Sequence, residues 1–364
     1  MAPHTADDAI SRRAAFERDG FVLVDELVDA ETVARLNARL ERVLRGDYDL
    51  GRAPHRSPKP GGGKLAQRSK RTVHVVDASR ADAAFAAVVR SPKLAALASE
   101  LGGWPHGARV ANDQVWAKPP GCGGLVFHRD SPYFDEILPR SVDGGACAVI
   151  TIWLALDDMR DDARGPLRYA RGSHAWGDGR RGSAKVFFAP DATEQHALLR
   201  AAARAEGLDP DAIDFATAAV PAGGAAIHDG RCWHGSGPNL TDGPRRGLGV
   251  HFVPAVSAFD ALALFPRDAR GALWRRESRS VALPEAGVWL APGAADAYAH
   301  RCAAADAALA DRGARRLEAA ALACPRLFAG LDGASRRALA ATSRAAAAAC
   351  FARGTRWWRR RRGS

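Results

Sequence analysis

A histidine and an aspartate separated by one residue, His128 and Asp130, form the first pair in this chain whose spacing could do chemistry. Residues i and i+2 of a β-strand face the same side, so an imidazole and a carboxylate can meet at one point. His234, much later in the chain, could supply a third ligand. Two histidines and a carboxylate occupy one face of an octahedral Fe(II) ion and leave positions open for a co-substrate and O2. The three residues therefore predict a metal centre suited to oxygen chemistry.

An arginine eleven residues after His234, Arg245, could bind the co-substrate 2-oxoglutarate. One carboxylate of 2-oxoglutarate chelates the metal, and the distal one needs a cation, for which the planar guanidinium is well shaped. Pro244 ends a polar turn and an apolar run follows, so Arg245 is expected to open a strand. We expect this strand to lie beside the one that carries His234, with metal and cation close together across one sheet. Arg246 is the rival, because adjacent strand residues face opposite sides.

With these residues the chain resembles the phytanoyl-CoA dioxygenase family of Fe(II)/2-oxoglutarate oxygenases. The family pattern joins H-x-D to H-G-S, N-x-[ST] and an arginine at this offset. Two further family motifs, W-x-A-L-D-D and G-x-L-x-x-x-x-G-S-H, occur here at 153–158 and 165–174. The resemblance covers roughly residues 14 to 255. It implies a non-haem dioxygenase that hydroxylates a small organic molecule and converts 2-oxoglutarate to succinate.

The resemblance also assigns roles residue by residue. It implies that His128, Asp130 and His234 ligate iron, and that Arg245 binds the distal carboxylate with help from Ser236.

Other assignments carry an alternative. Gln114 and Lys118 precede H-x-D, where family side chains line the co-substrate pocket, but they could also form a solvated strand edge. Trp153 matches a family tryptophan that packs on the co-substrate, but it could be an ordinary core aromatic. His228 is expected to donate to backbone beside the metal ligands, and His251 to be a plain strand residue.

Short β-rich runs separated by Gly/Pro turns dominate the chain from residue 108 to 253, including expected strands over 231–234 and 246–253. Helices are expected over 6–19 and 192–206, as one helix over 81–101, and from an N-cap at Asp29. Many short strands with flanking helices predict a mainly β fold, a double-stranded β-helix of the jelly-roll or cupin-like kind that shelters a metal between its sheets.

The 364-residue chain is long enough for one oxygenase domain, expected over 1–258, and an extension over 259–364 that is rich in Ala and Arg. We expect the extension to be helical or partly disordered. The net charge of +11 is concentrated at 51–71 and in an arginine-rich tail. Such a tail could contact anionic surfaces or simply be solvated. Nothing in the oxygenase portion predicts a nucleic-acid fold, so the expected partner is a small-molecule substrate.

Six cysteines without C-x-x-C spacing indicate reduced thiols. The sequence shows neither an apolar run of membrane-spanning length nor a signal-peptide pattern, and its final tripeptide is not peroxisomal. A cytoplasmic enzyme is therefore expected. Two other classes of protein stay open: a β-barrel binding protein with a vestigial metal site, and a zinc hydrolase.

Overall fold

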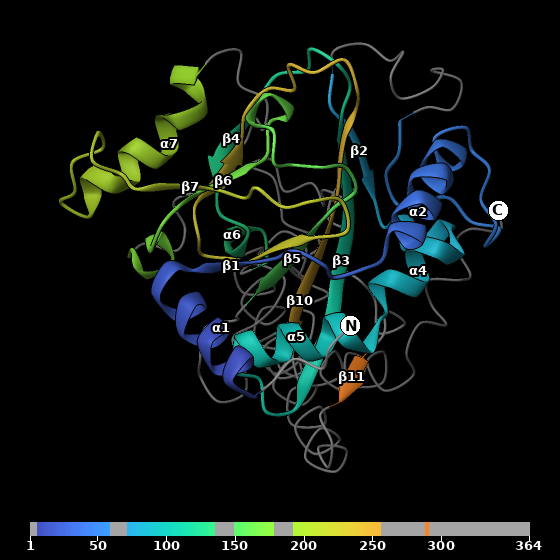
Figure 1. The fold of residues 1–364 in the computed structure, drawn as a ribbon, viewed down its shortest axis with the longest axis horizontal. Coiled ribbons are helices and arrows are strands. Elements are labelled where there is room, and N and C mark those ends of the chain that lie inside the picture. The colour runs from blue at the N-terminus through green and yellow to red at the C-terminus, as the bar shows by residue number, and fades with distance from the viewer. Residues whose placement is uncertain (1–5, 59–70, 135–148, 178–191, 256–287, 291–364) are drawn as a thin grey trace, which may run out of the picture.

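Two antiparallel sheets with flanking helices make up the computed structural model, which describes residues 6–58, 71–134, 149–177, 192–255 and 288–290 (Figure 1). The larger sheet has seven strands. In spatial order these are β1 (Phe21–Val24), β8 (Ala225–Asp229), β5 (Ile150–Ala155), β10 (Arg245–Pro254), β3 (Gly107–Lys118) and β11 (Val288–Leu290), with β2 (Val73–Val76) also paired to β3.

The smaller sheet has four strands: β4 (Leu125–His128), β9 (His234–Ser236), β6 (Leu167–Ala170) and β7 (Phe215–Thr217), in that order. His128 and His234 are directly opposite each other on β4 and β9. The expected strand over 231–234 is wrong, because residues 231–233 form a turn and the strand begins at His234.

The two faces of the larger sheet differ in chemistry because side chains alternate along each strand. The outer face is apolar: Val115, Ile152 and Leu248 join the main core with Leu36 and Phe85 from the covering helices. These helices include α2 (Ala30–Val43), α4 (Ala83–Val89) and α5 (Pro92–Gly102). The inner face is turned toward the smaller sheet and carries most of the polar residues discussed below.

Contacts between the sheets define this inner face. Phe21 of β1 stacks on Tyr169 of β6, with ring centroids 4.5 Å apart. Lys118 of β3 donates a hydrogen bond to Ser236 of β9. Polar side chains that alternate with the apolar outer residues are therefore held between two sheets, away from water.

Helix boundaries follow local capping. Asp29 caps α2 as expected, its side chain accepting from the Thr32 amide at 2.7 Å. The single helix expected over 81–101 is wrong, because this stretch holds the end of α3 (Ala78–Ala81) and then α4 and α5. Asp82 caps α4, and Pro92 starts α5 because proline has no N–H to continue a preceding helix.

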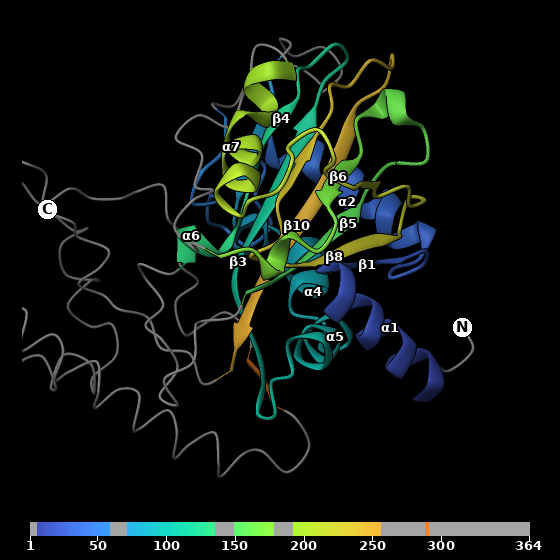
Figure 2. The same cartoon turned by 90° about the vertical axis from the view of Figure 1, so that its left-hand side faces the viewer.

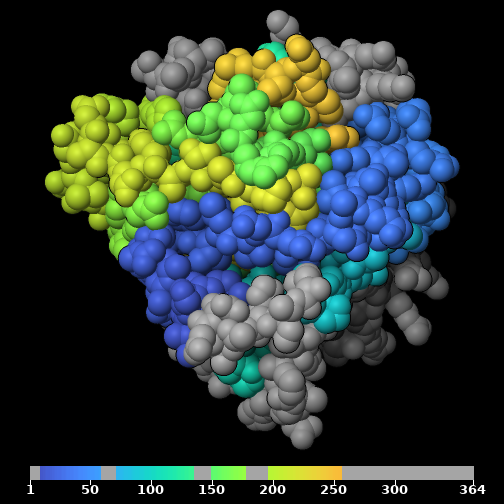
Figure 3. Space-filling model, viewed as in Figure 1, coloured from blue at the N-terminus to red at the C-terminus, as the bar shows by residue number. Residues whose placement is uncertain are grey.

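The remaining helices lie around the sheets. The predicted helices appear as α1 (Ala6–Asp19) and α7 (Ala192–Ala205), and a short α6 (Ser131–Phe134) follows β4. Helix α7 lies beside β4 (Figures 1 and 2). The space-filling view shows the N-terminal segment, in blue, against the green and yellow segments of the middle of the chain (Figure 3).

Most of the expected extension over 259–364, including the basic tail, lies outside the described residues, as does much of the basic stretch over 51–71. One strand of that region, β11, pairs with Gly107–Arg109 of β3 and so joins the larger sheet. In the described part of the chain, no helix has the length and apolar character needed to cross a bilayer.

Candidate metal centre and co-substrate pocket

The three predicted metal ligands converge between the sheets. The ligand atoms of His128, Asp130 and His234 all lie within 4.8 Å of one another. Asp130 Oδ1 is 3.8 Å from His128 Nε2 and 3.7 Å from His234 Nε2. Asp130 lies in the turn after β4 and not on the strand itself, with its backbone N–H bonded to the Gly230 carbonyl at 2.8 Å. This turn, and not a strand face alone, brings the carboxylate to the histidines.

Backbone carbonyls select the tautomer of both histidines. His128 Nδ1 is 2.9 Å from the Val126 carbonyl, and His234 Nδ1 is 3.0 Å from the Cys232 carbonyl. A carbonyl only accepts, so Nδ1 carries the proton and the lone pair of Nε2 faces the centre.

Electrostatics keep the two rings uncharged. Burial, and next the charge on a neighbouring histidine, lower the pKa of His128 and His234 to about 4. At neutral pH the rings are therefore neutral, which is the form that binds a metal.

The second oxygen of Asp130 is held from the larger sheet. Thr151 Oγ1 donates to Oδ2 at 2.6 Å, His228 Nε2 lies at 3.1 Å and His251 Nε2 at 3.5 Å. Burial alone would raise the pKa of Asp130, but the electrostatic interaction with His234 and hydrogen bonds from His228 and His251 hold it well below its ordinary value. The carboxylate is thus ionised, with Oδ1 turned toward the two ligand histidines.

Two expectations about histidines are wrong in detail. His228 donates to the Asp130 carboxylate and not to backbone, while its Nδ1 meets the Tyr169 hydroxyl at 2.9 Å. His251 is more than a plain strand residue, because it too faces Asp130. Thr151 was not predicted. It lies between His251 of β10 and His228 of β8, a neighbourhood that only the strand register reveals.

Arg245 is fully buried beside this centre. Its Cζ lies 4.6 Å from the centre of the Trp153 ring. Its Nε, Nη1 and Nη2 have no hydrogen-bond partner in the part of the chain that the structure describes. Burial lowers the pKa of Arg245 to about 10, so it stays a cation at neutral pH. Buried charges are ordinarily paired, so this fork has the properties of an anion site.

Lys118 and Ser236 lie at the same end of the pocket. Lys118 is the direct neighbour of Arg245 across β3 and β10, and its Nζ donates to Ser236 Oγ at 2.8 Å and to the Gly237 carbonyl at 2.5 Å. Burial, then the charge of Arg245, keep the pKa of Lys118 well below its ordinary value. A bound carboxylate would relieve the repulsion between the two basic groups.

The expected placement of Arg245 beside His234 in one sheet is wrong. Arg245 starts β10 of the larger sheet, whereas His234 starts β9 of the smaller one. Cation and metal ligands therefore face one another across the space between the sheets. Arg246 points the other way and pairs with Asp157, Nη2 to Oδ1 at 2.5 Å.

Gln114 shares the inner face of β3 with Lys118, but it is engaged with aromatic side chains. Its Oε1 is 2.9 Å from His74 Nε2 and 3.1 Å from Trp116 Nε1, and the rings of His74 and Trp116 stack with centroids 3.8 Å apart. Among the residues predicted to bind the co-substrate, Gln114 differs from Lys118 and Ser236 because its contacts are with His74 and Trp116 and not with the basic groups.

Two glycines of β10, Gly247 and Gly249, lie between Arg245 and His251 on the inward face of the larger sheet. A Cβ at Gly247 would lie 2.1 Å from the Trp153 ring, so only glycine lets the indole lie there. A Cβ at Gly249 would make only ordinary van der Waals contacts, the nearest at 3.7 Å, so a methyl group would fit there. Trp153 therefore contacts Arg245 and also belongs to a buried apolar cluster with Phe21 and Tyr169.

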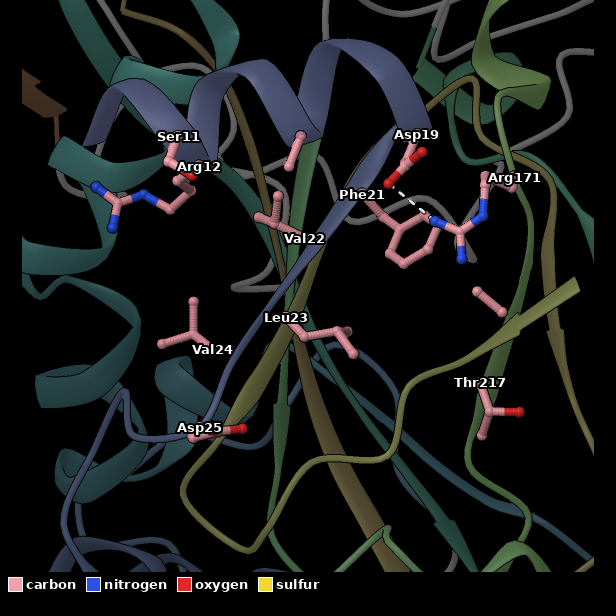
Figure 4. Close-up of a pocket in the computed structure, with 12 residues that line it drawn as sticks. Ser11, Arg12, Asp19, Phe21, Val22, Leu23, Val24, Asp25, Arg171 and Thr217 are labelled. Carbon is pink, nitrogen blue, oxygen red and sulfur yellow. Dashed lines mark ion pairs between the residues drawn. The ribbon is translucent and has the colours of Figure 1, made fainter. Parts of the chain in front are cut away.

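A surface hollow of about 730 Å³ lies elsewhere, between α1, β1 and the β7 edge (Figure 4). Its polar feature is the ion pair between Asp19 and Arg171 at 2.8 Å. Among the described residues, the cluster suited to a metal is the His128–Asp130–His234 group, and none of these lines the hollow. The candidate metal centre therefore lies between the sheets and not in this hollow.

Comparisons with known proteins agree with this geometry. A phytanoyl-CoA dioxygenase (PhyH) family profile matches residues 16–247. An ectoine dioxygenase of Streptomyces coelicolor is 28% identical over 245 residues, covering 65% of this chain and 75% of that protein. An ectoine dioxygenase of Bordetella parapertussis is 33% identical over 165 residues, covering 44% of this chain and 47% of that protein. The chain thus matches about half the length of the Bordetella relative.

Solved structures share the fold. The non-haem alpha ketoglutarate dependent epimerase SnoN from nogalamycin biosynthesis aligns with a TM-score of 0.53 at 23% identity, covering 78% of this chain and 99% of that one. EctD from S. alaskensis in its apoform aligns with a TM-score of 0.51 at 18% identity, covering 77% of this chain and 89% of that one.

Proposed function

Because the chain belongs to the phytanoyl-CoA dioxygenase family, we propose that it is a non-haem Fe(II)/2-oxoglutarate-dependent dioxygenase that hydroxylates a small organic substrate. The observation that carries the proposal is Arg245, a fully buried cation whose three guanidinium nitrogens lack partners among the described residues. A carboxylate in that position would satisfy the fork in two parallel hydrogen bonds.

The donor set fits ferrous iron. His128 and His234 offer neutral Nε2 atoms and Asp130 offers one carboxylate oxygen, a facial set that leaves coordination positions open. When bound, Fe(II) with 2-oxoglutarate and O2 supplies the oxidising power for C–H hydroxylation, while 2-oxoglutarate becomes succinate and CO2.

The protein's own part is to hold geometry and exclude water. Arg245, Lys118 and Ser236 would bind the distal carboxylate of 2-oxoglutarate, and Trp153 would hold the guanidinium flat. Thr151 and His228 fix the outer oxygen of Asp130, so the inner one stays turned toward the metal. The buried surroundings of these groups strengthen each electrostatic contact.

We infer that the two sheets form the double-stranded β-helix of this enzyme class and that residues 1–258 carry the activity. The aligned part covers less than half of one curated relative, so its substrate does not transfer directly. Ectoine is nevertheless the first compound to test, because the curated relatives are named ectoine dioxygenases.

Anaerobic titration with Fe(II) and then 2-oxoglutarate tests the proposal, followed by measurement of succinate after O2 is admitted. We expect one iron per chain, a new absorption band on adding 2-oxoglutarate, and succinate formation that Asp130→Ala abolishes. A zinc hydrolase would bind zinc and release no succinate, and a vestigial binding protein would retain no tightly bound metal. Either result, or wild-type turnover in Asp130→Ala, would reject the assignment.

A further inference from the structure

Asn239 lies in the crossover between the two sheets and is completely buried. Its Nδ2 donates to the carbonyls of Lys118, Pro119 and Gly243 at 3.0, 3.3 and 2.8 Å. Its Oδ1 accepts from the Thr241 amide at 3.2 Å and from Thr241 Oγ1 at 2.7 Å. Because a carbonyl only accepts and a peptide N–H only donates, the orientation of this side-chain amide is unambiguous.

The carbonyls that Asn239 binds belong to the segments that carry the two basic residues of the co-substrate pocket. Strand β3 ends at Lys118, where two prolines follow that have no N–H with which to extend a ladder. Gly243 lies two residues before Arg245, the first residue of β10. Lys118 and Arg245 are direct neighbours across these strands. The Asn239 side chain thus joins the end of one strand to the start of the other.

The backbone of the crossover is fixed as well. The Asn239 N–H donates to the Cys122 carbonyl at 2.8 Å, and the Asn239 carbonyl accepts from the Gly121 N–H at 2.9 Å. The crossover also packs against Gly165, where a Cβ would lie 2.5 Å from two of its carbonyl oxygens. It is therefore held both to the turn after β3 and to the turn before β6.

A local constraint is needed to keep Lys118 beside Arg245. Both side chains are fully buried, and among the described residues neither has a carboxylate partner. Burial, and then the charge of Arg245, keep the pKa of Lys118 well below its ordinary value, so the two basic groups are costly neighbours. The hydrogen bonds of Asn239 offset this cost by fixing the backbone at Lys118 and just before Arg245.

We propose that Asn239 is a positioning residue for the co-substrate: its side chain holds the end of β3 and the start of β10 so that Lys118 and Arg245 face one carboxylate. The proposal rests on the proposed function, because that carboxylate is the distal one of 2-oxoglutarate. Thr241 contributes by binding Oδ1, which keeps Nδ2 turned toward the three carbonyls. The asparagine and threonine of the N-x-[ST] pattern thereby act on 2-oxoglutarate without touching it.

Two 2-oxo acids of equal chain length separate a positioning role from a merely structural one. 2-Oxopentanoate keeps the chelating end of 2-oxoglutarate and has a methyl group in place of the distal carboxylate. Binding of each acid is measured by anaerobic calorimetry on the full chain loaded with Fe(II). Wild type should bind 2-oxoglutarate about a hundredfold or more tightly than 2-oxopentanoate, the worth of two charged hydrogen bonds.

Substitution in the crossover should reduce this preference. Asn239→Ala should weaken 2-oxoglutarate binding about tenfold and leave 2-oxopentanoate within about twofold of wild type. Thr241→Val keeps the shape and the contacts of Nδ2, so it should weaken 2-oxoglutarate binding only about two- to threefold. This milder variant tests the proposal if Asn239→Ala does not fold. Iron affinity, measured by competition with a chelator, should match wild type in both variants.

Asn37→Ala is the matched control. Asn37 also donates through its amide to a backbone carbonyl, that of Leu156 at 2.8 Å, but it bonds neither Lys118 nor the crossover. It should lower the temperature of unfolding without changing the ratio of the two dissociation constants. If the Asn239 and Thr241 variants behave like this control, or weaken both acids equally, the proposal is overturned.

Failure of the proposed function would give a different result, namely a wild type that does not prefer 2-oxoglutarate. A crystal structure of the variant then tests the positioning role by itself. Displacement of Lys118 Nζ from Ser236 Oγ, 2.8 Å away in the wild type, together with movement of Arg245, would support it. Unchanged positions of Lys118 and Arg245 would overturn it.

Discussion

Arg245 stacks on Trp153, its Cζ 4.6 Å from the ring centre, with no hydrogen bond to its guanidinium from the described residues. The indole face attracts the cation and fixes its plane, and it leaves the edges of the fork free. Gly247 makes this possible, because any side chain there would occupy the place of the indole. Gly247, Trp153 and Arg245 thus form successive layers of the proposed carboxylate site.

Substitution of Arg245 should weaken 2-oxoglutarate binding, whereas substitution of Arg246 should lower the stability of the fold. Two charged hydrogen bonds are each worth about 1.5–3 kcal/mol. Arg245→Ala should therefore raise the 2-oxoglutarate concentration needed for half-maximal turnover roughly a hundredfold or more. Arg245→Lys should recover only part of the lost 2-oxoglutarate affinity, because lysine lacks the planar guanidinium. The measurement is succinate formation against 2-oxoglutarate concentration. A larger shift in Arg246→Ala than in Arg245→Ala would contradict the assignment.

Arg246→Ala serves as the matched control for that experiment. It leaves Asp157, which is largely buried, without its ion pair. We expect a loss of about 1–3 kcal/mol in the free energy of unfolding, with 2-oxoglutarate dependence close to wild type.

The two glycines of β10 should respond differently to alanine. Gly247→Ala places a methyl group 2.1 Å from the Trp153 ring, so the indole must move and Arg245 loses its support. We expect about 1–3 kcal/mol of destabilisation from overpacking, and weaker 2-oxoglutarate binding. Gly249→Ala meets only ordinary contacts and should fold normally. Thermal unfolding and 2-oxoglutarate titration of both variants check this prediction. Equal destabilisation by the two substitutions would contradict it.

Thr151→Val should weaken iron binding while leaving the ligands in place. The substitution keeps the shape and removes the 2.6 Å hydrogen bond to the outer oxygen of Asp130. Loss of a group that orients a metal ligand typically lowers metal affinity about 10- to 100-fold. We expect a loss of iron affinity of about tenfold, because His228 still bonds the Asp130 carboxylate in this variant. Competition with a chelator measures the affinity. Unchanged iron affinity would mean that Thr151 serves folding alone.

Asp113, on the outer face of β3, should make stability depend on pH. Burial, then the charge of Asp77, raise the pKa of Asp113 to about 7, and Ser79 Oγ donates to its Oδ2 at 2.5 Å. Between the ordinary pKa and pH 7 the folded state binds the proton that the unfolded state has released. The contribution of Asp113 to stability therefore falls as pH rises through this window.

The matched variant is Asp113→Asn, which keeps an acceptor for Ser79 and cannot ionise. Its stability relative to wild type should improve from pH 5 to pH 8, as measured by urea unfolding at both values. A constant difference between the two proteins would show that Asp113 does not ionise in this range.

Removal of residues 269–364 should leave the chemistry intact at some cost in stability. The strand that is lost, β11, pairs with Gly107–Arg109, nine residues and so about 30 Å from Lys118 along β3. We expect a chain ending at residue 268 to turn over 2-oxoglutarate, and one ending at residue 292 to be more stable because it keeps β11. Loss of 2-oxoglutarate binding in the shorter chain, if it is folded, would place part of the site beyond residue 258.

The sequence predicted the residues whose proposed roles depend on their chemical type. His128, Asp130 and His234 were grouped by residue type and spacing, strand alternation allowed only one of Arg245 and Arg246 to face inward, and the family resemblance favoured Arg245. Asp29 as a helix cap is equally local, since its side chain bonds an amide three residues away.

The contacts to Asp130 that were not predicted depend on which strands are neighbours. Thr151, His228 and His251 meet Asp130 only because β5, β8 and β10 are adjacent in the larger sheet. The same reason explains why His234 and Arg245 were expected in one sheet. Residues 237–244 were expected to connect two neighbouring strands of one sheet, whereas they cross from the smaller sheet to the larger one.

The inward residues of β10, in order Arg245, Gly247, Gly249 and His251, have a consequence for how such enzymes could diverge. The two predicted histidine ligands belong to the smaller sheet, whereas these four residues belong to the larger one. A new side chain at position 249 would therefore alter the inward face of the larger sheet while the two histidines keep their places on the smaller one. Oxidative capacity and molecular selectivity could thus be inherited separately within one fold.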